Sequence, residues 1–204
     1  MPHTAAALPG FDSPGVGFEQ PFEMLLACHE RVQRSLDLLG RLVEHIDRNG
    51  HDDQSRSAAT DVLRYFDLAA PLHHADEETH VFPLLLARDD AAMHEAVKKL
   101  QAEHRRMEVL WAAVREPLLR WSRPGAADKV SQQTRADVAS FRAIYGGHID
   151  AEEGLVFPAA RSQMQDAELA AMGQAMQARR HARACLHSRT HKELRAAPSG
   201  SGGG

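Results

Sequence analysis

The strongest constraint on the fold is an internal repeat. Residues 73–83 read HHADEETHVFP and residues 148–158 read HIDAEEGLVFP, with six of the eleven positions identical. The same offset of 75 residues aligns His29 with His104. In each half, the single histidine lies 44 residues before the first histidine of the repeated motif. Chance rarely matches histidine, phenylalanine and proline together over so short a stretch. The repeat therefore predicts two equivalent structural units that pack against each other.

Apolar residues recur at helical spacing in both halves. From Val32 to Ile46, leucine, valine and isoleucine fall three or four positions apart, and Asn49-Gly50 follows as a stop signal. We expect long helices over residues 22–48, 55–88, 91–119 and 131–160, a short fifth helix over 166–180, and no strands. The fold class is all-α. Each half would form a helix hairpin, and two hairpins make an antiparallel up-down four-helix bundle.

The repeat also predicts where two of these helices are irregular. The offset of 75 residues aligns Pro71 with Gly146, and Gly147 follows Gly146 directly. A proline inside a helix removes a hydrogen bond and clashes with the preceding turn, and small flexible residues also permit a kink. We therefore expect a break or kink two residues before the repeated histidine in each half, with Gly146-Gly147 interrupting the helix at 131–160.

Composition and the ends of the chain limit the other function classes. The formal net charge is −4 and 43% of the residues are hydrophobic, which gives no reason to expect nucleic acid or an anionic membrane as a partner. No apolar run approaches the length of a membrane-spanning helix. We expect a bundle over residues 18–180, a flexible segment at 1–17 without the pattern of a secretory signal, and a flexible tail at 181–204 that is basic and then rich in glycine and serine.

The residues that commonly bind metals are mostly histidines. Two cysteines, Cys28 and Cys185, are too few for a disulfide framework or a zinc ribbon, which favours a reducing, cytoplasmic location. The chain contains 13 histidines, and histidine is the commonest metal ligand in proteins. Their positions in the repeat are therefore more informative than their number.

The repeated motif places histidine and glutamate four residues apart. Residues with this spacing share one face of a helix, with about 5–6 Å between their Cβ atoms. Four imidazoles and two carboxylates would then meet at one depth of the bundle, a donor set that suits two ions better than one and that fits iron, manganese or zinc. The predicted metal ligands are His29, His73, Glu77, His104, His148 and Glu152.

Neighbouring side chains leave alternatives open. His74 and Glu78 form a second pair four residues apart, but Ile149 stands where the other half would need its histidine, so the repeat favours His73 and Glu77. His80 and Glu108 also have spacings that could add a ligand. Glu78 and Glu153 are expected to make contacts outside the donor set or at the surface.

Taken together, the paired H-x-x-x-E-E followed by F-P resembles the hemerythrin-like, or HHE cation-binding, family over residues 18–180. The resemblance implies that the six predicted ligands bind two iron ions (Fe²⁺/Fe³⁺) with a bridging oxo or hydroxo group. It also implies reversible binding of O2 or another small diatomic ligand, for storage, delivery or sensing.

One residue departs from the oxygen-carrying members of that family. Their third helix supplies two histidines, whereas here Glu108 stands four residues after His104. A di-iron enzyme or iron donor that acts on peroxide, NO or damaged Fe–S clusters is therefore the alternative. The repair proteins usually carry a cysteine-containing module before the bundle, and only residues 1–17 precede it here. A structural zinc site is the third possibility, although such sites favour four ligands that include cysteine.

Overall fold

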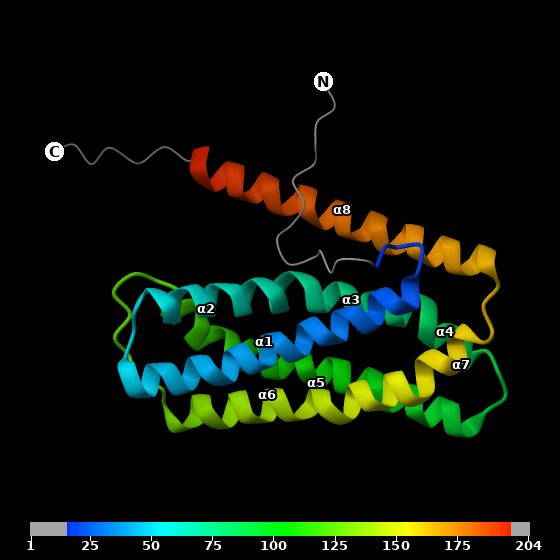
Figure 1. Cartoon of the computed structure of the whole chain (residues 1–204), viewed down its shortest axis with the longest axis horizontal. Coiled ribbons are helices and arrows are strands. Elements are labelled where there is room, and N and C mark those ends of the chain that lie inside the picture. Colours follow the sequence, from blue (N-terminus) through cyan, green and yellow to red (C-terminus); the bar gives the residue numbers. More distant parts are fainter. Residues whose placement is uncertain (1–15, 197–204) are drawn as a thin grey trace.

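The computed structural model describes residues 16–196 and the side chains up to Arg183, and this part of the chain is helical without strands. Four rods form the bundle, and α8 lies outside it (Figure 1). The first rod is α1 (Pro21–Asn49). The other three are the run of α2 (Asp53–Arg64), η1 (Tyr65–Ala69), α3 (Ala70–Asp76), η2 (Glu77–Val81) and α4 (Phe82–Leu86), then α5 (Ala91–Trp121), and last α6 (Gln132–Ala151) with η3 (Glu152–Val156) and α7 (Phe157–Arg161).

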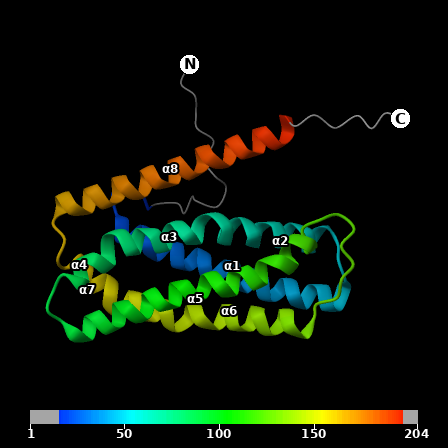
Figure 2. The ribbon, with the colours of Figure 1, turned by 180° about the vertical axis from the view of Figure 1, so that it is seen from behind.

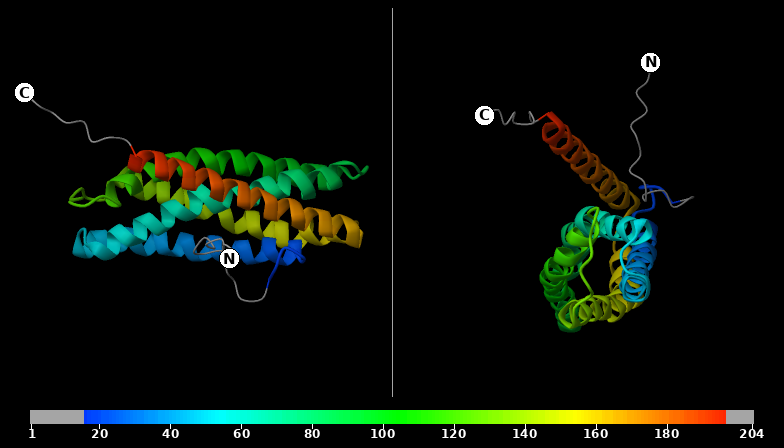
Figure 3. Two further views of the ribbon diagram at one scale, coloured as in Figure 1. Left: turned by 90° about the horizontal axis from the view of Figure 1, so that it is seen from above. Right: turned by 90° about the vertical axis from the view of Figure 1, so that its left-hand side faces the viewer.

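The rods form a closed ring. Contacts run from α1 to α2, from α2 to α5, from α5 to α6 and from α6 back to α1, and the end view in Figure 3 shows this ring with α8 outside it. Successive rods run in opposite directions, as the view from behind in Figure 2 also shows. The predicted all-α four-helix bundle is confirmed. Among the described residues, no helix is long and apolar enough to cross a membrane.

Several helix ends follow from local sequence. At the start of α2, the Asp52 carboxylate accepts a hydrogen bond from the Ser55 amide, and the Ser55 hydroxyl accepts one from the Asp52 amide. These reciprocal bonds satisfy amides that a helix N-terminus leaves without partners. Asp90 caps α5 in a similar way. Gly50 ends α1 with a φ of 77°, a conformation that only glycine adopts at little cost.

Two apolar clusters fill the bundle and leave a polar layer between them. One cluster contains Leu39, Phe66 and Phe141, and the other contains Leu25 and Phe82. On each rod, the predicted ligands lie between a residue of one cluster and a residue of the other: on α1, for example, the single histidine lies between Leu25 and Val32. The candidate site is therefore closed off from both ends of the bundle.

The predicted interruption at Gly146-Gly147 is wrong, because α6 continues through both glycines with ordinary helical backbone. A helix tolerates an interior glycine at a cost of about 1 kcal/mol, which tertiary packing offsets here. The same rod becomes irregular later, in the wider turn η3.

Each of the three π-helical turns ends two residues before a proline. They are η1 before Pro71, η2 before Pro83 and η3 before Pro158. Proline has no N–H and clashes with the carbonyl four residues earlier, so a wider turn lets the helix continue. The second rod is thus irregular at Pro71, as the sequence indicated. The repeated F-P pair places the other two turns one helical turn after the two repeated histidines.

The fifth helix is longer than predicted. α8 (Asp166–Ala196) continues past residue 180, so residues 181–196 have helical backbone where the sequence analysis expected no helix. No glycine or proline stands between Gly173 and Pro198, and a helix can continue through the alanine and arginine of this stretch. The remaining parts of the predicted flexible ends, 1–15 and 197–204, lie outside the described residues.

α8 packs against the first half of the bundle through a buried ion pair. The Asp76 carboxylate is fully buried and accepts hydrogen bonds from Arg179 and, at 2.7 Å, from Arg180. At Gly173 the helix comes so close that a Cβ atom would lie 1.8 Å from the Phe18 carbonyl oxygen. The position in the second half that corresponds to Asp76 is Ala151, so the repeat offers only one such docking site.

Replacing Asp76 with alanine should destabilise the metal-free protein by about 3–5 kcal/mol, because Arg180 would stay buried without a counter-charge. The matched control is Asp37→Ala, which removes the partner of Arg142 from an exposed ion pair and should cost less than about 1 kcal/mol. Urea denaturation of both metal-free variants measures the difference. Equal losses would show that the buried pair does not hold α8 on the bundle.

Candidate metal centre

The structure brings all six predicted ligands into the polar layer of the bundle. They come from four rods, and none is more than 3% exposed. Glu77 and Glu152 are the first residues of the π-helical turns η2 and η3, one helical turn after the repeated histidines. The six side chains are His29 on α1, His73 on α3, His104 on α5, His148 on α6, and the two glutamates.

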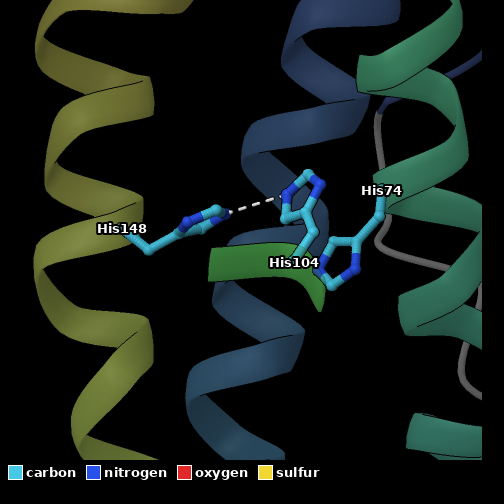
Figure 4. Close-up of side chains that lie close together, drawn as sticks. All are labelled: His74, His104 and His148. Atoms are coloured by element: carbon cyan, nitrogen blue, oxygen red, sulfur yellow. Dashed lines mark hydrogen bonds between the residues drawn. The ribbon is translucent and has the colours of Figure 1, made fainter. Parts of the chain in front are cut away.

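The donor atoms form two groups. In the first group, ring nitrogens of His29 and His73 and carboxylate oxygens of Glu77 and Glu152 all lie within 4.8 Å of one another. In the second group, ring nitrogens of His74, His104 and His148 meet the same limit. Figure 4 shows these three imidazoles converging from α3, α5 and α6. Each group is compact enough to surround one metal ion.

Glu77 lies between the two groups. Its Oε1 is 3.1 Å from Nε2 of His73, and its Oε2 is 3.5 Å from Nε2 of His104. One carboxylate therefore presents one oxygen to a histidine of each group. A carboxylate in this position can bridge two ions.

Glu152 repeats this arrangement in the second half. Its Oε2 is 3.1 Å from Nε2 of His29, and its Oε1 is 3.0 Å from Nε2 of His148. The two carboxylates thus relate the groups to each other by the same pseudo-twofold symmetry that the sequence repeat shows. The arrangement has room for two ions with shared carboxylates.

Outer glutamates fix the orientation of the histidine rings. Nδ1 of His29 donates to Glu153 at 2.8 Å, and Nδ1 of His104 donates to Glu78 at 2.9 Å. The second glutamate of each repeated E-E pair therefore holds the single histidine of the other half, which confirms the contacts outside the donor set that were expected for Glu78 and Glu153. An acceptor at Nδ1 keeps the proton there and turns the Nε2 lone pair towards the centre.

His148 has an outer partner that the sequence did not reveal. Its Nδ1 lies 3.0 Å from the Glu103 carboxylate. The corresponding residue in the first half is Cys28, so comparison of the halves could not identify Glu103. Its position next to His104 was the only available signal.

The electron-rich groups in this layer lack compensating donors. All four carboxylate oxygens of Glu77 and Glu152 are buried without a hydrogen-bonding partner, as are both ring nitrogens of His73. Burying unpaired polar or ionised groups costs several kcal/mol. A cation in their midst would supply the missing interaction, so the donor set fits a bound metal.

Two ring nitrogens of the second group are as far apart as two ligands of one metal ion would be. Nε2 of His104 and Nε2 of His148 lie 3.1 Å apart, as the dashed line in Figure 4 marks. In the metal-free centre this contact is a hydrogen bond between the two ring nitrogens. Two nitrogens bound at right angles to one ion, each at about 2.1 Å, would lie about 3 Å apart.

Burial and neighbouring charges shift the pKa values of the carboxyls and imidazoles in the metal-free centre. Burial, and then repulsion from Glu152, raises the pKa of Glu77 well above its ordinary value. Burial also opposes ionisation of Glu152, but its contacts with His148 and His29 lower the pKa of that carboxyl. Burial lowers the pKa of His73 and His74 well below the ordinary value, so both imidazoles stay neutral. The two buried carboxyls of the metal-free centre thus differ in acidity, and a bound cation would favour the ionised form of both.

Three further residues named in the sequence analysis have different positions. His74 joins the second donor group, with its ring stacked on that of His104 at a centroid distance of 3.9 Å and an interplanar angle of 11°. His80 is half-buried and belongs to neither donor group. Glu108 is exposed, belongs to neither group, and lines a cavity of about 190 Å³ that reaches His74 and His104.

Comparison with known proteins agrees with this geometry. Residues 20–160 match the family described as Hemerythrin HHE cation binding domain. An uncharacterized protein of Haemophilus influenzae is 30% identical over 168 residues, which cover 80% of this chain and 91% of that protein. The matched range contains both donor groups and both outer glutamates of the repeat.

Removing an outer glutamate should weaken metal binding by about 10–100-fold, the usual effect of losing a partner that orients a ligand. Glu78→Ala should affect the ion next to His104, and Glu153→Ala the ion next to His29. Glu44→Ala, an exposed carboxylate paired with Arg48, is the control. Competitive titration with a metal-sensitive chelator measures the affinities. Unchanged affinities in both variants would contradict the role of these hydrogen bonds.

Metal binding should also release protons, because the raised pKa of Glu77 leaves a proton on the carboxylate pair before the ion arrives. Metal affinity should therefore rise with pH, up to the pH at which the metal-free protein has already lost this proton. Calorimetric titration in two buffers with different ionisation enthalpies gives the number of protons released. A number near zero at neutral pH would show that the pair is already fully ionised.

Proposed function

The chain belongs to the hemerythrin HHE cation-binding family, and from this premise we propose that it is a non-haem di-iron protein that reversibly binds O2 or a similar small ligand for storage, delivery or sensing. The observation that carries the proposal is the position of the two buried carboxylates between two groups of imidazoles. Such a centre supplies electrons for reversible binding of a small ligand.

The donor set supports iron as the metal. Imidazole nitrogens and carboxylate oxygens without thiolate suit iron, and Cys28 belongs to neither group. His29 and His73 would hold one ion, His104 and His148 the other, and both glutamates would bridge, together with an oxo or hydroxo group. Two divalent ions carry a charge of +4 against −2 from the carboxylates, so the extra bridging anion is electrostatically favoured.

Aromatic rings keep water away from the centre. The ring of Phe157 stacks on His29 with a centroid distance of 5.4 Å, and Phe82 stacks on His104 at 5.6 Å. Both rings are almost fully buried and come from the repeated F-P pair. A dry, apolar surrounding limits side reactions with solvent, which a protein that must release its ligand unchanged requires.

The cavity next to the centre suits a small uncharged ligand. Its volume is about 190 Å³, and its walls include Phe66, Met107 and Trp111. No lysine or arginine lines it, whereas the carboxylates Glu78 and Glu108 do. This surface disfavours anions and accepts neutral molecules such as O2 or NO.

The same two carboxylates support an alternative. A di-iron enzyme that reduces peroxide or NO needs protons, and Glu78 and Glu108 are exposed to solvent and also line the cavity. An iron donor for damaged Fe–S clusters would instead need a readily released ion. These activities differ from ligand binding in whether the reduced centre is oxidised irreversibly.

The deciding experiment is metal analysis with optical spectra of the anaerobically reduced protein before and after exposure to air. We expect about two irons per chain and a new absorption band that disappears when O2 is removed. Irreversible oxidation with consumption of peroxide or NO would support the enzyme. Zinc, or no metal after loading with iron, would overturn the di-iron proposal.

A matched pair of variants ties the metal to the named residues. Replacing both Glu77 and Glu152 with alanine should abolish iron binding, because it removes both shared carboxylates. Replacing the exposed Glu30 and Glu44 with alanine removes the same charge and should leave two irons per chain. Full iron loading of the first variant would refute the assignment.

A further inference from the structure

We propose that α8 is a working part of the metal centre although it supplies none of the six ligands: Arg180 positions Glu77 from outside the bundle, through the buried carboxylate of Asp76. The inference rests on the proposed function, because it concerns how firmly the centre holds its ions. α8 lies outside the ring of four rods (Figure 3) and beyond residues 20–160, the range that matches the family. The ligands thus come from the matched bundle, and a positioning residue comes from the helix that follows it.

Asp76 connects α8 to a shared ligand because it directly precedes Glu77. Both side chains are fully buried. Consecutive residues point about 100° apart around a helix, so the two carboxylates leave the backbone in different directions. Glu77 reaches histidines of both donor groups, whereas Asp76 reaches α8. A contact that fixes Asp76 therefore also fixes the backbone from which the shared carboxylate extends.

The backbone at Glu77 needs such a contact because it is irregular. Glu77 is the first residue of the π-helical turn η2, where α3 ends. A turn of this kind departs from the regular hydrogen-bond ladder of an α-helix. The carboxylate oxygens of Glu77 also have no hydrogen-bonding partner in the metal-free centre. The contact one residue earlier is therefore a direct restraint on the position of this side chain.

Arg180 holds Asp76 by a short, buried hydrogen bond. Its guanidinium donates to Oδ2 of Asp76 at 2.7 Å and to the carbonyl oxygen of Met176 at 3.0 Å. The side chain is 7% exposed and lies over the ring of Phe18, 5.4 Å from the ring centroid. Hydrogen bonds between charged groups are strong, and burial strengthens them further. Water therefore competes little with this contact.

Arg180 also lies close to the first rod. Burial raises the pKa of the Cys28 thiol, and the nearby guanidinium of Arg180 acts against this effect. Cys28 directly precedes His29, as Asp76 directly precedes Glu77. One side chain of α8 thus lies beside the residues that precede two ligands of the first donor group, and these two ligands belong to different rods.

The other half of the repeat lacks this device. Ala151 stands at the position of Asp76 and directly precedes Glu152. A methyl group cannot bind a guanidinium, so this half offers α8 no equivalent contact. α8 therefore restrains one of the two shared carboxylates from outside the bundle.

The coupling must act in both directions. Met172 and Met176 of α8 are buried in the apolar cluster on that side of the polar layer, so packing also holds the helix on the bundle. If docking of α8 strengthens metal binding, metal binding strengthens docking by the same factor. Loading the centre with metal should therefore suppress local opening of α8.

The test is the rate of iron release from Arg180→Met, with Arg142→Met as the matched control. Arg142 belongs to an exposed ion pair with Asp37. Iron-loaded, reduced proteins are mixed with excess ferrozine without air, and the colour of the Fe²⁺ complex reports the iron released. We expect Arg180→Met to release iron about 10-fold faster than wild type, the lower end of the usual effect of losing an orienting partner. Arg142→Met should release it at the wild-type rate.

Two further variants separate positioning from a general loss of stability. Leu39→Ala leaves a cavity in the other apolar cluster and destabilises the whole bundle, but the folded protein should release iron at the wild-type rate. Arg180→Lys keeps the charge and should release iron at a rate between those of wild type and Arg180→Met. If Arg180→Met loses its helical circular dichroism, Arg179→Met replaces it, because Arg179 binds the same carboxylate and is more exposed.

Hydrogen exchange provides an independent readout. In wild type, the amides of residues 172–180 should exchange more slowly when the centre is loaded with iron than when it is metal-free. This difference should be lost in Arg180→Met. The amides of α2, which lie in the other apolar cluster, are the reference for any stabilisation of the whole bundle.

The outcomes separate this inference from the proposed function. Wild-type release from Arg180→Met, equally fast release from Leu39→Ala, or exchange in α8 that does not respond to iron would overturn the role of Arg180 while the di-iron proposal stands. Failure of the wild-type protein to hold two irons would overturn both, and that result is visible before any variant is made.

Discussion

Two carboxylates buried face to face in the middle of a helical bundle are the constraint on which the rest of this structure depends. Glu77 and Glu152 are fully buried, and their oxygens have no hydrogen-bond donors. In an apolar interior such a pair is unfavourable unless a cation lies between them. The rods on either side must therefore be stable enough to hold the pair in the metal-free state. Two separate apolar clusters, above and below the polar layer, provide that stability.

The symmetry of the repeat is kept in the buried carboxylates and in the outer glutamates that contact the histidines. The second glutamate of each E-E pair holds the single histidine of the opposite half, so each half orients one ligand of the other. The differences between the halves that bear on this site include three pairs of corresponding positions: Cys28 and Glu103, His74 and Ile149, and Asp76 and Ala151. The last difference explains why α8 docks on the first half, since only that half offers a buried carboxylate to Arg179 and Arg180.

The sequence predicted the bundle and the six residues of the polar layer because these depend on periodicity and on a repeat, which can both be read without coordinates. It misplaced the irregular turns because Gly146 and Gly147 only weaken a helix, whereas Pro158 changes its hydrogen bonding further along. It ended α8 too early because the residues after Arg180 are charged, and charge does not stop a helix. His74, which lies beside His104 and His148, was set aside because the repeat was used to choose between registers, and that comparison gives no information on a histidine present in one half alone.

The surroundings of the two donor groups differ more than the predicted ligands do. Aromatic cover is repeated, because Phe157 stacks on His29 and Phe82 stacks on His104. The cavity of about 190 Å³ is not repeated: of the two donor groups, it is lined by His74 and His104 alone. Small molecules can therefore approach the polar layer more closely on the side of His104 than on the side of His29. The repeat thus builds two similar sets of ligands, and residues outside the repeat decide which of them is accessible.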